Sequence, residues 1–196
     1  MITDYASLQT ELIANSNRSD LTTLVQTFIQ LCEADMQRRL KLVDFETTAT
    51  VTVTAGVGSL PTGYAGHRSA YWDGDENRPL RYITPDRFAA LTDVVTIPTF
   101  FTITGSSLKV MSQSTGSVVM MYMARFTPLS ASATTNAIVT NYPDAYFHGA
   151  LVHLYTHTRN DAMADRHKAL YEQAVSGVIK DHKDRKYPGP LEVRPR

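Results

Sequence analysis

The chain has 196 residues, of which 43% are hydrophobic and 19% are charged, and this composition excludes an intrinsically disordered protein. Its 19 basic and 19 acidic residues balance, so no overall field attracts nucleic acid or an anionic membrane. Because we find neither a signal sequence nor a run of about 18 apolar residues, we expect a soluble protein that has no membrane partner and is made in a reducing cytoplasm.

The first 44 residues are predicted to form a helical hairpin. A short helix is expected over residues 4–14, and a polar turn over residues 15–20 leads into a long amphipathic helix over residues 21–41. Ser19 or Asp20 is expected to cap the start of the long helix, because short polar side chains accept hydrogen bonds from the first free amides.

Three residues on the apolar face of the long helix need an explanation. Cys32 is the only cysteine, which excludes an internal disulfide, and its position predicts a core thiol rather than a nucleophile. Asp35 and Arg39 interrupt the apolar face, and they stand four residues apart with the acid first, so they can pair along the helix. Either this pair lies at the edge of the core, or the face meets a second copy of the chain and the pair sets the register. Asp35 and Arg39 are therefore our candidates for a subunit interface.

Residues 45–128 are predicted to form an inserted antiparallel β module. Alternation rich in threonine and valine predicts a strand over 45–54, and glycines predict a loop over 56–63. Residues 68–72 and 80–83 are expected to pair as a hairpin. The remaining elements expected in this module are a helical turn over 84–91, with Pro85 at its first position, and strands over 100–104, 108–111 and 118–126.

Residues 129–186 are predicted to return to helix and complete the bundle. The segment 128–140 is interpreted as a connecting loop, after which Asn141 is expected to cap a helix. A break at residues 160–161 is expected to separate it from a last helix that ends near residue 183. The order of helices, strands and helices predicts an α+β fold. In this fold an antiparallel helical bundle, made of the N-terminal hairpin and the C-terminal helices, carries the inserted antiparallel β module.

His153, His157 and Asp161 form the only pattern that suggests a metal-dependent enzyme. Their spacing of four residues would place them on one face of a continuous helix, and two such histidines can hold zinc with further ligands. However, the sequence lacks the glutamate of the zinc-protease pattern and a cysteine pair. We interpret the three residues as a solvated or subunit-facing stripe, and we expect no catalytic residue, no metal site, no cofactor and no enzymatic activity.

A second class of function, carbohydrate or host binding by the β module on a helical stalk, would depend on aromatic residues. Trp72 follows Tyr71, and Tyr64 precedes them in the same module. Tryptophan and tyrosine rings stack on sugars, but in strands they more often pack against a core. Exposure of all three rings in one cleft would favour this alternative.

The C-terminal segment has the composition of a partner-binding arm. Residues 180–196 contain six Lys/Arg, three acids and three prolines. Residues 187–196 cannot form a core of their own, and their prolines favour extended structure. They form either a solvated end or an arm that becomes ordered on a neighbouring chain, where alternate apolar side chains fill pockets.

Several stretches, taken together and in this order, make the chain resemble the head–tail adaptor (connector) family of tailed bacteriophages. Each stretch has packing residues rather than a catalytic motif, and together they extend from Asp4 to about Lys183. The stretches are residues 4–8, the turn 17–21, the long helix 28–40, the β segments 68–71 and 78–85, and the helix start 141–151.

The resemblance implies a virion structural protein at the head–tail interface. Such adaptors form a ring, usually of twelve copies, beneath the portal protein, and the ring extends the DNA channel and offers a docking platform for tail proteins of the nozzle, tube or fibre. DNA would pass through the ring without sequence-specific binding, and a neutral chain agrees with this expectation. By analogy with family members whose C-terminal extension reaches the portal, the resemblance implies portal-binding residues in the arm, namely Tyr187, Pro188, Leu191, Val193, Arg194 and Arg196.

Overall fold

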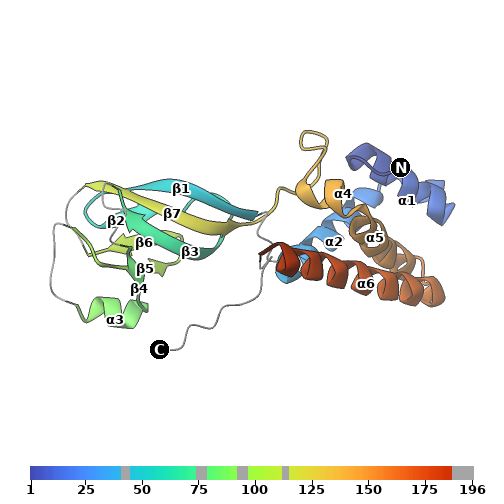
Figure 1. Cartoon of the computed structure of the whole chain (residues 1–196). Coiled ribbons are helices and arrows are strands. Elements are labelled where there is room, and N and C mark those ends of the chain that lie inside the picture. Colours follow the sequence, from blue (N-terminus) through green and yellow to red (C-terminus); the bar gives the residue numbers. More distant parts are fainter. Residues whose placement is uncertain (41–44, 74–78, 92–96, 112–114, 187–196) are drawn as a thin grey trace, which may run out of the picture. The chain divides into compact units, whose positions relative to one another are not determined.

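In a computed structural model of the chain, the described residues are 1–40, 45–73, 79–91, 97–111 and 115–186. They form two compact units (Figure 1). The helical unit contains Met1–Asp44 and Phe126–Arg196, and the β unit contains Phe45–Arg125. This arrangement confirms the predicted α+β class, with a helical bundle into which an antiparallel β module is inserted.

The helical unit is built around one central helix. That helix, α5, contacts α1, α2, α4 and α6 (Figure 1). Tyr146, Leu151 and Leu154 of α5 are buried, as are Leu12 of α1 and Ile29 of α2, and each buried leucine or isoleucine contributes about 1.5–3 kcal/mol. The helices are α1 (Tyr5–Ser16), α2 (Val25–Arg39), α4 (Ala137–Asn141), α5 (Pro143–His157) and α6 (Asp161–Lys186), with a 3₁₀ turn η1 at Ser19–Leu21.

The β unit consists of two sheets that share one core. The strands are β1 (Glu46–Val53), β2 (Val57–Ser59), β3 (Tyr64–Trp72), β4 (Arg81–Tyr82), β5 (Phe100–Thr104), β6 (Ser107–Val110) and β7 (Gly116–Ala124), and the short helix α3 spans Pro85–Ala89. One sheet has the order β1-β7-β3 and the other β2-β6-β5-β4. All described ladders are antiparallel except the two-residue pairing of β4 with β5. Val51 and Met120 of the first sheet and Phe101 and Leu108 of the second belong to one buried cluster.

The structure corrects the predicted start of the long helix. α2 begins at Val25 rather than at residue 21, because Leu21 ends the 3₁₀ turn. The N-cap is Leu24, which makes no side-chain cap hydrogen bond. Asp20 pairs instead with Arg18 at 2.8 Å, so the predicted cap by Ser19 or Asp20 is wrong. Leu21 is buried although it precedes the helix, and this burial extended the apolar pattern beyond the true boundary.

Short elements account for the other corrections. The predicted loop at 56–63 contains β2, and the predicted loop at 128–140 contains most of α4. The predicted hairpin of 68–72 with 80–83 is confirmed only as one antiparallel bridge between Tyr71 and Pro79, beside which the Leu80 amide donates to the Ala70 carbonyl at 2.8 Å. The strand ladders instead pair β3 with β7 and β4 with β5. Asn141 ends α4 and does not cap α5.

The last two helices follow the prediction more closely. Arg159 has φ 56° in the left-handed region, and this residue produces the expected break between α5 and α6. α6 continues to Lys186, three residues beyond the expected end.

Candidate functional site

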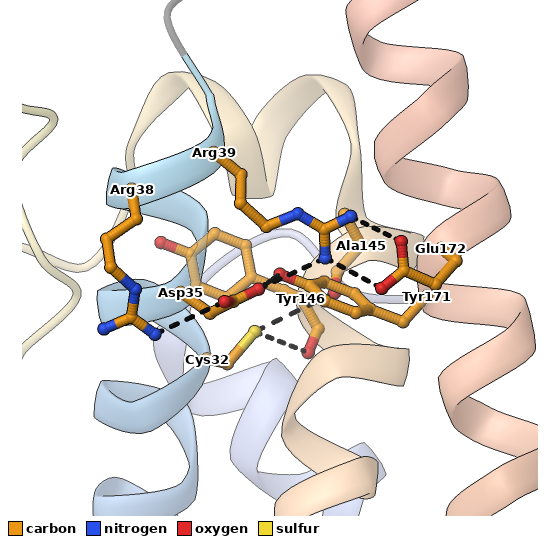
Figure 2. Close-up of polar contacts among 8 residues, drawn as sticks. All are labelled: Cys32, Asp35, Arg38, Arg39, Ala145, Tyr146, Tyr171 and Glu172. Atoms are coloured by element: carbon orange, nitrogen blue, oxygen red, sulfur yellow. Dashed lines mark hydrogen bonds and ion pairs between the residues drawn. The ribbon is translucent and has the colours of Figure 1, made fainter.

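The most extensive polar network of the helical unit that we describe links α2 to α6. It is formed by Asp35 and Arg39 of α2 and by Tyr171 and Glu172 of α6 (Figure 2). Asp35, Arg38 and Arg39 fall on successive turns near the C-terminus of α2, where cationic side chains also interact favourably with the helix dipole. The network therefore depends on two helices that are far apart in the sequence.

Arg39 and Glu172 form a two-bonded fork. Nη1 of Arg39 donates to Oε1 of Glu172 at 2.9 Å, and Nη2 donates to Oε2. The guanidinium also lies 5.4 Å from the ring centroid of Tyr171, within the range of a cation–π contact. The hydrogen bonds with Glu172 raise the pKa of Arg39, and the same bonds lower the pKa of Glu172. Both side chains are partly solvated, so the fork fixes geometry more than it adds stability.

Asp35 bonds both to the arginines on the next turn of α2 and to the buried Tyr171 of α6. Its carboxylate accepts from the hydroxyl of Tyr171 at 2.8 Å, from Arg38 at 3.3 Å and from Arg39 at 3.4 Å. Burial alone would raise the pKa of Asp35, but the hydrogen bonds from these three residues outweigh it and the pKa is lowered. Asp35 is therefore a stable carboxylate and is not positioned as a proton donor at neutral pH.

Close packing of α2, α5 and α6 forms the floor of the network. A Cβ atom at Gly149 would lie 2.3 Å from the sulfur of Cys32 and 2.9 Å from the ring of Tyr171, so only glycine allows this approach. Cys32 is 1% exposed, and burial raises the pKa of its thiol well above the usual value. The prediction of a core thiol rather than a nucleophile is confirmed.

The three helices border an open cleft of about 630 Å³ beside this network. Its charged lining consists of four acids and two cations in addition to His153, which gives a net negative rim. Such a lining suits a polar protein segment better than an apolar ligand. The cleft is lined by Cys32, Asp35, Arg39, Gly149, Val152, His153, Thr156, Asp161, Ala164, Asp165, Lys168, Tyr171 and Glu172.

The predicted pairing of Asp35 with Arg39 is confirmed, but the sequence did not reveal their partners on α6. Tyr171 lies on the buried side of the last helix. Apolar residues that repeat every three or four positions predict that a tyrosine faces a neighbouring helix. They do not predict which carboxylate its hydroxyl bonds. Whether Asp35 and Arg39 also contact a second copy of the chain stays a prediction.

The structure does not bring the predicted histidine stripe together. His153 and Asp161 line the cleft, whereas the ring of His157 packs against Phe28 with centroids 5.5 Å apart. The left-handed Arg159 redirects the chain before Asp161. Among the described residues no group of three His, Cys, Asp or Glu side chains could hold a metal ion.

The aromatic residues of the β unit do not share one cleft. Tyr64 and Trp72 occupy opposite ends of β3, about 26 Å apart at the usual rise per strand residue. Both pack against the core, Tyr64 stacked on Tyr122 and Trp72 against Gly116. Tyr71, next to Trp72, is half-buried. This packing removes the arrangement that sugar binding by these rings would require.

The remaining predicted residues lie outside the described residues. These are Tyr187, Pro188, Leu191, Val193, Arg194 and Arg196 of the arm. In the part of the chain that the structure describes, no helix is both long and apolar enough to cross a membrane.

The comparison with known families matches nearly the whole chain. The sequence model of the SU10 adaptor protein family matches residues 3–194. The chain belongs to the SU10 adaptor protein family. Membership confirms the resemblance to phage head–tail adaptors that the sequence indicated. No curated protein matches the chain.

An SU10 adaptor is a structural protein of the phage virion, and the geometry described above agrees with this role. The one cysteine is buried and its pKa is raised, and the polar network described above joins α2 to α6 through an ion pair and a tyrosine hydroxyl. These features hold a fold together and position surfaces. The match spans both units, so the inserted β unit is part of the family architecture.

Proposed function

We propose that this SU10 adaptor forms a ring of twelve copies beneath the portal, where it extends the DNA channel and provides the docking platform for tail proteins. The observation that carries this proposal is the family match over residues 3–194, which includes both units and most of the arm. The balanced charge supports a channel wall along which DNA slides, since a strongly basic wall would hold phosphates.

The arm is assigned to the portal. Residues 187–196 contain the apolar Tyr187, Leu191 and Val193 together with Arg194 and Arg196, a composition that suits docking in an extended form. To test this, the protein lacking residues 187–196 is mixed with portal, and binding is compared with that of the full chain. We expect weaker docking with an unchanged circular dichroism spectrum. Unchanged docking would remove the arm from the portal contact.

The subunit contact is assigned to the acidic cleft and its rim. Asp35 and Arg39 stand where α2 meets α6, and the cleft beside them is open and charged. A charged contact of this kind specifies register between copies rather than adding much stability. Reversing the charge of either residue is expected to impair assembly on the portal more than it lowers the melting temperature.

The tail platform is assigned to the β unit. Large apolar side chains are exposed on it, including Val57 at 46% and Tyr82 at 43%. A small apolar cleft of about 360 Å³ lies between α3 and β5 and is lined by Ile83, Arg87, Ala90, Leu91 and Phe100. Exposed apolar surface with a polar border is typical of a protein-binding site. Binding of purified tail protein to a Leu91→Asp variant tests this assignment, with reduced binding expected.

A further inference from the structure

A groove in the helical unit remains unexplained by the roles proposed above. It has a volume of about 700 Å³, and its lining is mainly apolar. Its lining includes Pro143 and Phe147 of α5 and Ile2, which precedes α1. We call it the α1–α5 groove, and it is lined by Met1, Ile2, Thr3, Glu11, Thr140, Pro143, Asp144, Phe147 and His148.

One carboxylate at this groove has no hydrogen-bond or ion-pair partner among the described residues. The amino group of Met1 donates to Glu11 at 3.0 Å, and Nδ1 of His148 shares a hydrogen bond with Nδ1 of His167 at 3.1 Å. The side chain of Asp144 is exposed and makes no hydrogen bond or ion pair with the described residues, although its charge acts on nearby His148, where it opposes the lowering of the imidazole pKa by burial. An occupant with apolar side chains and one cation would therefore complement the groove.

The helix that precedes the arm, α6, ends close to this groove. Nη2 of Arg185 donates to the hydroxyl of Tyr142 at 2.8 Å, and that hydroxyl donates to Asp181. These contacts hold the last turns of α6 against the residue that directly precedes Pro143 of the groove. Residues 187–196 follow directly after Lys186, the last residue of α6, and ten residues can extend over about 33 Å.

The arm also has the composition that the groove requires. Pro188 and Pro190 oppose continuation of the helix. Leu191 and Val193 are two residues apart, so they would share one face of an extended segment, and Arg194 follows directly after them. The arm thus offers two apolar side chains and a cation in a short span.

We propose that the arm docks in the α1–α5 groove of its own chain in the free protein. Leu191 and Val193 contact Phe147 and Pro143, and Arg194 pairs with Asp144. The contact stands without the portal assignment. A further consequence rests on the proposed binding of the arm to the portal. The portal must then compete with the groove for the same arm, so the arm stays covered until the adaptor docks.

Paramagnetic broadening in the full chain tests the contact. A nitroxide is attached to an E192C variant, and Cys32 stays unlabelled because it is buried. We expect broadened amide signals at Thr140, Asp144 and Phe147. The broadening should be lost in an additional L191D/V193D variant, which keeps the tether length, and retained in L191I/V193I. A D144K variant should weaken it, and adding R194D should restore it.

Three results would overturn the proposal. In the first, the E192C label on an otherwise native arm broadens no groove signal. In the second, the broadening survives the L191D/V193D change. In the third, an isotope-labelled chain without nitroxide is broadened by the nitroxide of a second copy that carries no isotope label. The last result would place the arm on a neighbour. No portal is present in this test, so its failure would leave the proposed portal docking untouched, and failed portal docking would leave the groove contact untouched.

Discussion

Arg39 and Glu172 are separated by 133 positions in the chain, yet their side chains meet in a two-bonded fork between α2 and α6 (Figure 2). The fork links the N-terminal part of the helical unit to its C-terminal part. Because the β unit is inserted between these parts, this fork and the packing around it join segments that the insertion separates in sequence.

Removing the fork is expected to cost little stability. Glu172→Gln should lower the free energy of unfolding by about 1 kcal/mol or less, because both side chains are partly solvated. Urea unfolding measures the change. The same variant mixed with portal separates stability from assembly: if the rim of the cleft is a subunit contact, ring formation should fall more than this small loss explains. A loss above about 3 kcal/mol would contradict the view of a solvated ion pair.

Gly149 and Gly177 provide a matched pair of helical glycines. Gly149→Ala should destabilise the protein by about 1–3 kcal/mol, because its Cβ would collide with Cys32 and Tyr171. At Gly177 nothing lies within 4 Å of an added Cβ, so Gly177→Ala should stabilise α6 by up to about 1 kcal/mol. Urea unfolding of both variants checks the sign of each change. Equal effects at the two positions would show that close packing at Gly149 is not important.

Glu33 holds the chain that returns from the β unit. Its side chain is 2% exposed, and it accepts from the amide of Leu129 at 2.7 Å and from the hydroxyl of Tyr146 at 2.9 Å. Glu33→Ala should cost about 2–4 kcal/mol in urea unfolding, because both donors lose their acceptor in the core. Glu33→Gln keeps an acceptor oxygen and should cost less. A neutral Glu33→Ala would mean that the returning segment is held by other contacts.

The pair His148 and His167 predicts a pH dependence of stability. Burial lowers the pKa of both imidazoles, and for His167 the neighbouring His148 and Arg166 lower it further. Asp144 opposes the shift at His148. In the unfolded chain both residues bind protons near pH 6.5, whereas the folded protein binds them only at lower pH. Stability is therefore complete above this pH and decreases as the pH falls through the lowered pKa values.

Unfolding in urea at about pH 8 and about pH 5 measures this decrease. A His148→Gln variant should show a smaller decrease, because one of the two titrating groups is absent. It should not abolish the decrease, since burial also lowers the pKa values of His67 and His153. Identical pH profiles for the variant and the parent chain would remove His148 from the explanation.

The sequence predicts elements with a long or regular pattern. The apolar period of α5 and α6 and the alternation of β1 indicated those elements, and Arg159 lies in the expected break. The short elements were not predicted, because tertiary contacts rather than a sequence pattern stabilise them. β2 contains Gly58, where a Cβ would lie 2.7 Å from Val51, so its glycine allows close packing rather than marking a loop.

The polar network between α2 and α6 was predictable from the sequence only for contacts within one helix. Asp35 and Arg39 are one helical turn apart, so their pairing could be expected from spacing alone. Glu172 and Tyr171 could not be assigned as partners, because the choice depends on how α2 and α6 pack. α4 was missed for a similar reason: Asn136 caps it with bonds to the amides of Ile138 and Val139, within a segment that is polar and short.

The solution mass of the purified protein, alone and mixed with the portal of its own phage, tests the central claim most directly. The account predicts that the chain of 21.8 kDa joins the portal in a large complex with a ring of copies. A protein that remains at the mass of a single chain in the presence of portal would contradict the proposed adaptor ring.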